Sequence, residues 1–145
     1  MLTLKKLLSL QGYTAIGLTP TATNHFEINA TLNGIEGRFI LDTGASNTCL
    51  GLDSIEHFGL KTEFSEIKAA GAGSSEMETQ ISKKNQLEIG TWKIKKVALV
   101  LFDLTHVNHA LTMHNALPVH GIIGADVLKR GKAIIDYPKK RLYLK

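Results

Sequence analysis

The chain has 145 residues, a length that suits one domain burying roughly two-thirds of the surface its unfolded chain exposes. Its single cysteine excludes an internal disulfide scaffold, and no apolar run approaches the ~20 residues of a transmembrane helix. The net charge is +4, and no basic block is interleaved with aromatic residues, so we expect no nucleic-acid partner. The longest basic run, Lys139-Lys140-Arg141, is interpreted as a solvated turn beside Pro138.

Residues 1–22 are predicted to form an amphipathic lead-in, and residues 23–145 the domain proper. Lys5 and Lys6 are followed by only four residues before Gln11, which is too short for the apolar region of an export signal, and no small-residue cleavage site follows. Together with a lone thiol at Cys49, this predicts a cytoplasmic protein. The absence of a long apolar run predicts that it has no membrane partner.

The strongest strand pattern covers residues 25–32, where apolar and polar residues alternate. Asn33-Gly34 follows, a pair that favours a two-residue turn with positive φ, and residues 35–41 run back as a second strand. The two segments predict a hairpin that brings Phe39, Ile40 and Leu41 into the core.

The middle of the chain predicts a short strand at 47–50 and a short helix that Asp53 or Ser54 caps and Gly59 ends. Strands are expected at 64–70 and 76–82 around a glycine-bearing tip, and a further hairpin at 86–89 and 92–102. Residues 103–115 are expected to be weakly helical or irregular. These predictions leave few long helices in the chain.

The last part of the chain predicts a buried strand at 119–123, a helix at 125–130 closed by Gly131, and a hairpin formed by 133–137 and 141–144. Several short strands with closely spaced turns indicate a compact β-barrel or sandwich with two small helices.

Asp42 stands out because it directly follows a run of large apolar residues and precedes Gly44 by two positions. A carboxylate at a rigid, partly desolvated position is costly unless it is hydrogen-bonded or paired, so this placement suggests function. The alternative is an Asx-type turn in which Asp42 only caps the backbone.

A second segment, Ile122-Ile123-Gly124, lies directly before the predicted helix at 125–130. With Ile40-Leu41-Asp42-Thr43-Gly44-Ala45, in that order along the chain, it resembles the active-site signature of retropepsin-like (clan AA) aspartic proteases of the bacterial single-domain type. The resemblance implies an all-β fold: the closed acid-protease β-barrel with a flap hairpin and one or two short helices. It covers the chain from about Phe26 to Leu144.

By this resemblance, Asp42, Thr43 and Gly44 are the catalytic residues, with Thr43 bonding across a dimer to brace the two loops. Residues 67–82 correspond to the flap that closes over bound peptide. The residues that the resemblance places against substrate are Ala45, Ser46, Ala70, Gly71, Ala72, Gly73, Ile122 and Ile123. Ala45 stands where pepsin-like enzymes have a hydroxyl residue, and we expect a pH optimum nearer neutral than theirs.

Hydrolysis of a peptide bond by carboxylates needs two acids that share one proton. The chain has no second Asp-Thr-Gly or Asp-Ser-Gly, so the partner of Asp42 must come from a second copy of the chain. This predicts a homodimeric aspartic endopeptidase that acts on an extended peptide or protein, with no metal or organic cofactor.

Two other functions remain open from the sequence. The same dimer, catalytically inactive, could serve as a peptide-binding or assembly module. A metal-dependent hydrolase could use His106, His109, His114 and His120, although their spacing along a helix places His114 away from His109. Cys49 is interpreted as a small buried hydrophobic residue and not as a nucleophile.

Overall fold

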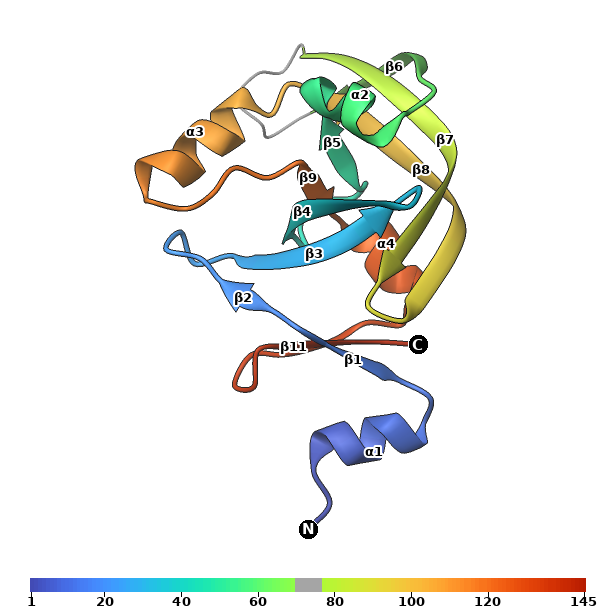
Figure 1. Ribbon diagram of the computed structural model, residues 1–145, viewed down its shortest axis with the longest axis vertical. Helices are drawn as coiled ribbons and strands as arrows, with labels where there is room; N and C mark the ends of the chain where they lie inside the picture. The colour runs from blue at the N-terminus through green and yellow to red at the C-terminus, as the bar shows by residue number, and fades with distance from the viewer. Residues whose placement is uncertain (70–76) are drawn as a thin grey trace.

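The computed structural model describes the backbone of residues 1–69 and 77–145, with side chains for 1–64 and 78–145, and most of it is β-structure (Figure 1). Six strands form a closed barrel: β3 (Phe26–Leu32), β4 (Ile35–Leu41), β9 (Gly121–Ile123), β5 (Cys49–Gly51), β8 (Trp92–Phe102) and β7 (Met77–Ile89). The ring closes because β7 also pairs with β3. The predicted all-β barrel class is therefore confirmed.

The hairpin of β3 and β4 has the predicted turn. Asn33 and Gly34 have φ of 53° and 85°, the positive values that a tight hairpin turn of this type requires. From Ile28 onward every second residue of β3 is buried, and Phe39 and Leu41 of β4 join the same core. The alternation in the sequence therefore sets the inner face of the barrel.

A second, three-stranded sheet is formed by β1 (Thr14–Gly17), β11 (Arg141–Leu144) and β10 (Ile134–Asp136), in that order. It lies below the barrel in Figure 1, with α1 (Leu4–Leu10) beneath it. The short β2 (Thr19–Pro20) pairs with β3. The segment predicted as a lead-in thus supplies a helix and two strands, and its boundary at residue 22 stays a prediction.

Short helices occupy the connections between strands: η1 (Leu52–Ser54), α2 (Ile55–Phe58), α3 (Thr105–Met113) and α4 (Ala125–Arg130). Gly59 ends α2 with φ of 60°, as predicted. Ser54, one of the two predicted caps, occupies the N-cap position of α2, but its side chain makes no capping bond; Asp53, the other, lies within η1. None of the helices in the described parts of the chain has the length and apolar character needed to cross a membrane.

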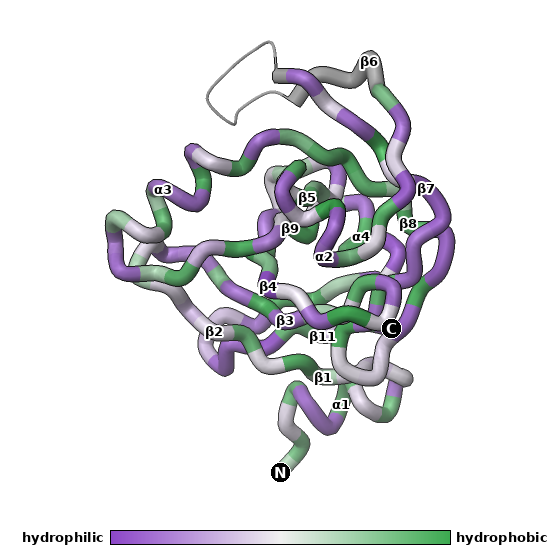
Figure 2. Tube along the Cα trace, turned by 45° about the horizontal axis from the view of Figure 1, so that its top comes forward, coloured by the Kyte–Doolittle hydropathy of each residue, from purple (hydrophilic) through white to green (hydrophobic). Residues whose placement is uncertain are grey.

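The strand β7 is longer than predicted, because segments 76–82 and 86–89 form one continuous element. The hydrophilic run between them, visible as purple tube in Figure 2, suggested a break. The chain instead continues through a bulge at which Lys84 takes φ of 62°.

Buried polar groups stabilise this bulge. Asn85 is 5% exposed, and its Nδ2 donates to the carbonyl oxygens of Ser82 and Val97, each at 3.1 Å. Its Oδ1 accepts from Asn33 Nδ2 at 2.9 Å, which ties the bulge to the turn of the first hairpin. The side-chain amide therefore replaces ladder bonds that the bulge removes, and it fixes the point at which β7 turns toward β3.

Helix α3 is regular where a weakly helical or irregular stretch was predicted. It packs on the outside of the barrel, where its Leu111 meets Ile40 and Val119. Asn108 accepts from Val119 N at 2.7 Å and donates to Val119 O at 3.1 Å. Because that backbone is bonded to a side chain, β9 begins at Gly121 and not at residue 119 as predicted.

Candidate active site

Asp42 lies at the end of a buried strand that runs beside the second motif. The last residues of β4 pair in parallel with β9, placing Leu41 opposite Ile123. Asp42 continues this register, because its N–H donates to Ile123 O at 3.0 Å. The Asp42 side chain is half-buried, while Thr43 and Gly44 are exposed. A carboxylate thus stands at the barrel surface on a backbone that is anchored in the core.

The loop after Asp42 is a tight turn built on its carboxylate. Gly44 N donates to Asp42 Oδ1 at 2.9 Å, and Ala45 N donates to Asp42 O at 3.2 Å. The Asx-type turn considered from the sequence is therefore present. It does not use the whole carboxylate, because among the described residues no hydrogen bond to Oδ2 is found. One oxygen therefore orients the group, and the other has no hydrogen-bond partner among the described residues.

The Asp42 loop and the second motif are locked together around Thr48. Thr48 is 1% exposed, and its hydroxyl accepts from Gly124 N at 3.0 Å and donates to Asp126 Oδ1 at 2.8 Å. Ala125 N donates to Ala45 O at 2.7 Å across the same junction. Sequence reasoning missed Thr48, whose only signal is a small hydroxyl residue just before a short buried strand.

Gly124 is required at this junction because the two segments approach so closely. A Cβ on Gly124 would lie 2.7 Å from Ala45 O and 2.9 Å from the carbonyl carbon of Asn47, and both contacts are with backbone. The glycine of the second motif therefore has a packing role that follows directly from the position of the first motif. Asp126, interpreted from the sequence as structural, bonds Thr48 in the first turn of α4.

The predicted substrate residues separate into three groups. Ser46 is exposed and Ala45 and Ile122 are half-buried, which leaves parts of their side chains accessible. Ile123 is 0% exposed and belongs to the barrel core, so its predicted contact with substrate is replaced by a packing role. The predicted flap residues Ala70, Gly71, Ala72 and Gly73 lie outside the described residues.

The arms of the predicted flap hairpin are described on both sides of that gap. β6 (Glu63–Ala69) pairs antiparallel with the first part of β7, from Glu63 opposite Ile81 to Ala69 opposite Met77. Phe64 on β6 is 79% exposed. The hairpin projects beyond the barrel at the top of Figure 1, on the same side as α3.

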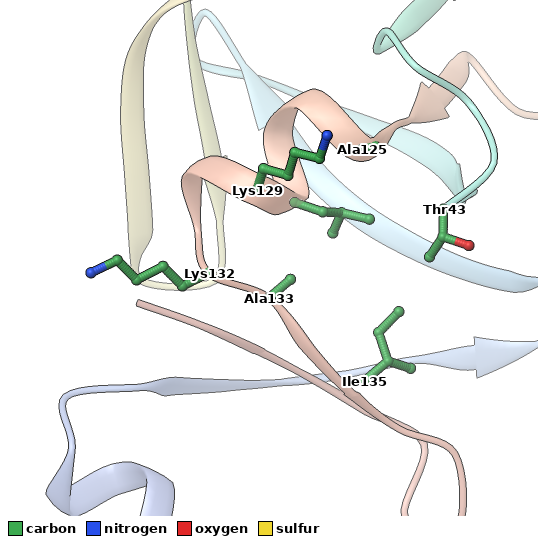
Figure 3. Close-up of a pocket in the computed structure, with 7 residues that line it drawn as sticks. Thr43, Ala125, Lys129, Lys132, Ala133 and Ile135 are labelled. Atoms are coloured by element: carbon green, nitrogen blue, oxygen red, sulfur yellow. The ribbon is translucent and has the colours of Figure 1, made fainter.

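A shallow cavity of about 350 Å³ lies beside the Asp42 loop, between α4 and the strand β10 (Figure 3). Its wall is mainly apolar and includes Thr43, Ala125, Leu128 and Ile135. Lys132 extends away from Thr43 in this view. The cavity therefore offers an apolar surface directly next to the residue that was predicted to brace a dimer.

Cys49 does not have the environment of a nucleophile. Burial raises the pKa of its thiol to about 12, and the carboxylates of Asp126 and Asp42 add to the effect. Its Sγ donates to Asn47 O at 3.1 Å. The thiol is therefore protonated at neutral pH, which agrees with its interpretation as a small packing residue.

The histidines do not form a metal centre in the described parts of the chain, where no three His, Cys, Asp or Glu side chains are grouped to hold an ion. His120 instead stacks on His57, with ring centroids 4.7 Å apart. Its Nδ1 accepts from Arg38 N at 3.0 Å. Burial lowers the pKa of His120, and His57 and Arg38 lower it further. This environment favours a neutral, structural imidazole.

The geometry can be compared with known proteins. A family model described as "Aspartyl protease" matches residues 28–127, which include Asp42 and Gly124. The chain belongs to the aspartyl protease family. No curated protein sequence matches this member of the family.

Solved structures have the same retropepsin-like fold. A retropepsin-like aspartic protease from Rickettsia conorii is 23% identical, with a TM-score of 0.65 and 91% of each chain covered. The retroviral protease-like domain of Ddi1 from Leishmania major is 18% identical, with a TM-score of 0.57 over 82% of this chain and 86% of that one. EIAV protease in complex with the inhibitor HBY-793 is 19% identical, with a TM-score of 0.51 over 71% and 84%.

Proposed function

We propose that this member of the aspartyl protease family is a homodimeric endopeptidase that uses one Asp42 from each subunit. The observation that carries the proposal is a single half-buried carboxylate, oriented by Gly44 N–H and standing on an exposed loop that is pinned to the barrel core. A twofold axis beside this loop would bring the two carboxylates into contact, as the reaction needs.

The chemistry follows from two adjacent carboxyl groups that share one proton. The ionised Asp42 takes a proton from a bound water as that water attacks the peptide carbonyl carbon. The protonated Asp42 of the other subunit gives its proton to the carbonyl oxygen as the tetrahedral intermediate forms. The first Asp42 then gives the proton it took from water to the amide nitrogen, the C–N bond breaks, and the nitrogen leaves as an amine. As the carbonyl re-forms, one hydroxyl of the intermediate gives its proton to the second Asp42. The dyad then returns to its shared-proton state.

We expect the substrate to be an extended peptide that adds a strand between the flap hairpin and the Asp42 loop. We expect the exposed Ser46 and the half-buried Ala45 and Ile122 to contact its side chains. The flap tip, Ala70 to Gly73, remains a prediction in this role. In binding of this kind we expect selectivity to come from apolar pockets that accept the side chains of the added strand.

The test is cleavage of a denatured peptide library by the wild-type chain and by Asp42→Asn. We expect the variant to fold and dimerise but to lose cleavage, and we expect wild-type activity to be blocked by a statine-type transition-state mimic and unaffected by chelators. Full cleavage by Asp42→Asn would end the proposal. Peptide binding by the wild-type chain without any cleavage would favour the alternative, a peptide-binding or assembly module.

A further inference from the structure

The charge of the chain is divided unevenly between its two ends. Residues 1–22 and 131–145, which form α1, β1, β2, β10 and β11, hold seven Lys and Arg against one acidic residue, Asp136. The rest of the chain holds ten basic and twelve acidic residues. The modest net charge of +4 therefore conceals a basic end, and its cations are Lys5, Lys6, Lys132, Lys139, Lys140, Arg141 and Lys145.

Helix α1 adds an apolar surface to this basic end. At about 100° per residue, Leu4, Leu7, Leu8 and Leu10 form one continuous arc of the helix, and the two lysines occupy the opposite arc. Only Leu8, at the edge of the apolar arc, is buried against the domain. Leu4 and Leu7 are exposed, and Leu10 is 81% exposed. Met1 and Leu2 extend the exposed apolar surface beyond the helix.

The helix is held in this position by specific contacts. Thr3 Oγ1 accepts from Lys6 N at 3.2 Å and caps the first turn. Tyr13 N donates to Leu8 O at 3.0 Å, and the Tyr13 hydroxyl donates to Lys132 O at 2.9 Å. Lys145 Nζ lies 5.9 Å from the centre of the Tyr13 ring. These contacts hold α1 beside the chain around Lys132 and Lys145, at the lower end of Figure 1.

We propose that this surface binds an anionic lipid bilayer, with Leu4, Leu7 and Leu10 entering the headgroup region and the surrounding lysines facing lipid phosphates. Exposed leucines together with cations are the combination by which interfacial helices bind membranes. The lone acid of this end, Asp136, is 9% exposed and accepts from Lys139 N, so its charge lies inside the fold.

The charge of the basic end favours a bilayer over a second copy of the chain. If a second copy docked on the same surface, the seven basic residues of one basic end would face the seven of the other. Their repulsion opposes self-association through this face. The expected lack of a membrane partner rested on the absence of a long apolar run, and a helix that lies on a bilayer does not need one. None of these leucines belongs to the Asp42 loop, so the inference stands or falls independently of protease activity.

The test is cosedimentation of the full chain with large unilamellar vesicles. We expect binding to vesicles of phosphatidylcholine with 30% phosphatidylglycerol, weakening as salt rises from 50 to 300 mM, and little binding to pure phosphatidylcholine. Lys6→Glu should lower the partition coefficient at low salt by at least about tenfold. Lys61→Glu, a matched reversal on an exposed lysine outside the basic end, should leave it unchanged.

A leucine variant separates insertion from charge. Leu7→Gln/Leu10→Gln should lower partitioning at both salt concentrations by at least about tenfold. It should retain the wild-type circular dichroism and melting temperature, because both side chains are exposed. Absence of vesicle binding, equal binding to neutral vesicles, or equal effects of Lys6→Glu and Lys61→Glu would overturn the proposal. Oligomers that form without lipid, and that the leucine variant abolishes while Lys6→Glu and Lys61→Glu do not, would also overturn the proposal. They would assign the surface to a second copy of the chain.

Discussion

Thr48 provides the most sensitive test of how the two active-site segments are joined. The buried hydroxyl of Thr48 bonds both Gly124 N and Asp126 Oδ1. Substitution of Thr48 by Val keeps the shape and the β-branch of the side chain but removes this hydroxyl. The buried Gly124 N–H then loses its acceptor, and the Asp126 carboxylate loses a donor.

The size of the effect can be worked from these two bonds. An unsatisfied buried N–H costs about 1–3 kcal/mol. A hydrogen bond to a carboxylate contributes about 1.5–3 kcal/mol, and less here because Asp126 is only half-buried and water can replace the hydroxyl. We therefore expect Thr48→Val to lower the free energy of unfolding by about 2–4 kcal/mol, with a fall in Tm of roughly 5–10 °C.

Thr48→Ser is the matched control, because it keeps the hydroxyl and removes one methyl group. It should lower the free energy of unfolding by about 1 kcal/mol, as expected for a buried methyl. The assay is urea unfolding at one fixed protein concentration, since a dimer's stability depends on concentration. Equal losses for Val and Ser would refute the bonding role of the hydroxyl and assign Thr48 to packing alone.

Three other substitutions test neighbouring features. Gly124→Ala places a Cβ 2.7 Å from Ala45 O, so it should lower the free energy of unfolding by at least about 1–3 kcal/mol. Gly17→Ala is the control, because a Cβ at Gly17 has no atom within 4 Å, and it should change the free energy of unfolding by under ~0.5 kcal/mol apart from the difference in strand propensity. Asn85→Ala should cost about 2–4 kcal/mol in the same urea assay, because it removes several buried hydrogen bonds; a change near zero would refute the role of the amide in the bulge. Because the pKa of Cys49 is raised, the folded state retains a thiol proton that the unfolded chain releases above about pH 9. The free energy of unfolding should therefore fall as the pH rises from 9 toward 12, and Cys49→Val should lessen this fall. A pH dependence identical to that of the wild type would contradict that assignment.

Much of the barrel could be predicted because its local signals agree with its tertiary contacts. The alternation in β3 and the Asn33-Gly34 turn specify a hairpin without information from elsewhere in the chain. Residues 14–20 carry no comparable pattern, and they become strands because β11 and β3 supply their partners. The bulge in β7 was missed for a related reason: Asn85 in the polar run that reads as a loop bonds Val97 on the next strand and Asn33, which lies 52 positions away.

At the candidate site, the sequence was sufficient for residues whose chemistry is unusual and insufficient for residues that act through contact. The sequence singles out Asp42 and Gly44 because a carboxylate and a glycine after an apolar run have few ordinary explanations. Thr48 could not be found in this way, because its importance arises from a partner 76 positions away along the chain. Ile123 was assigned to substrate because a motif does not state which face of a strand its residues occupy.

The requirement for two copies of Asp42 can be measured by mixing subunits. Wild-type and Asp42→Asn chains are unfolded together in equal amounts, refolded at a fixed total concentration, and assayed for peptide cleavage. If only dimers with two intact Asp42 residues are active, random pairing leaves about a quarter of the activity of the same total amount of wild-type protein. If each chain acts alone, about half remains, and that result would contradict an active site shared between subunits.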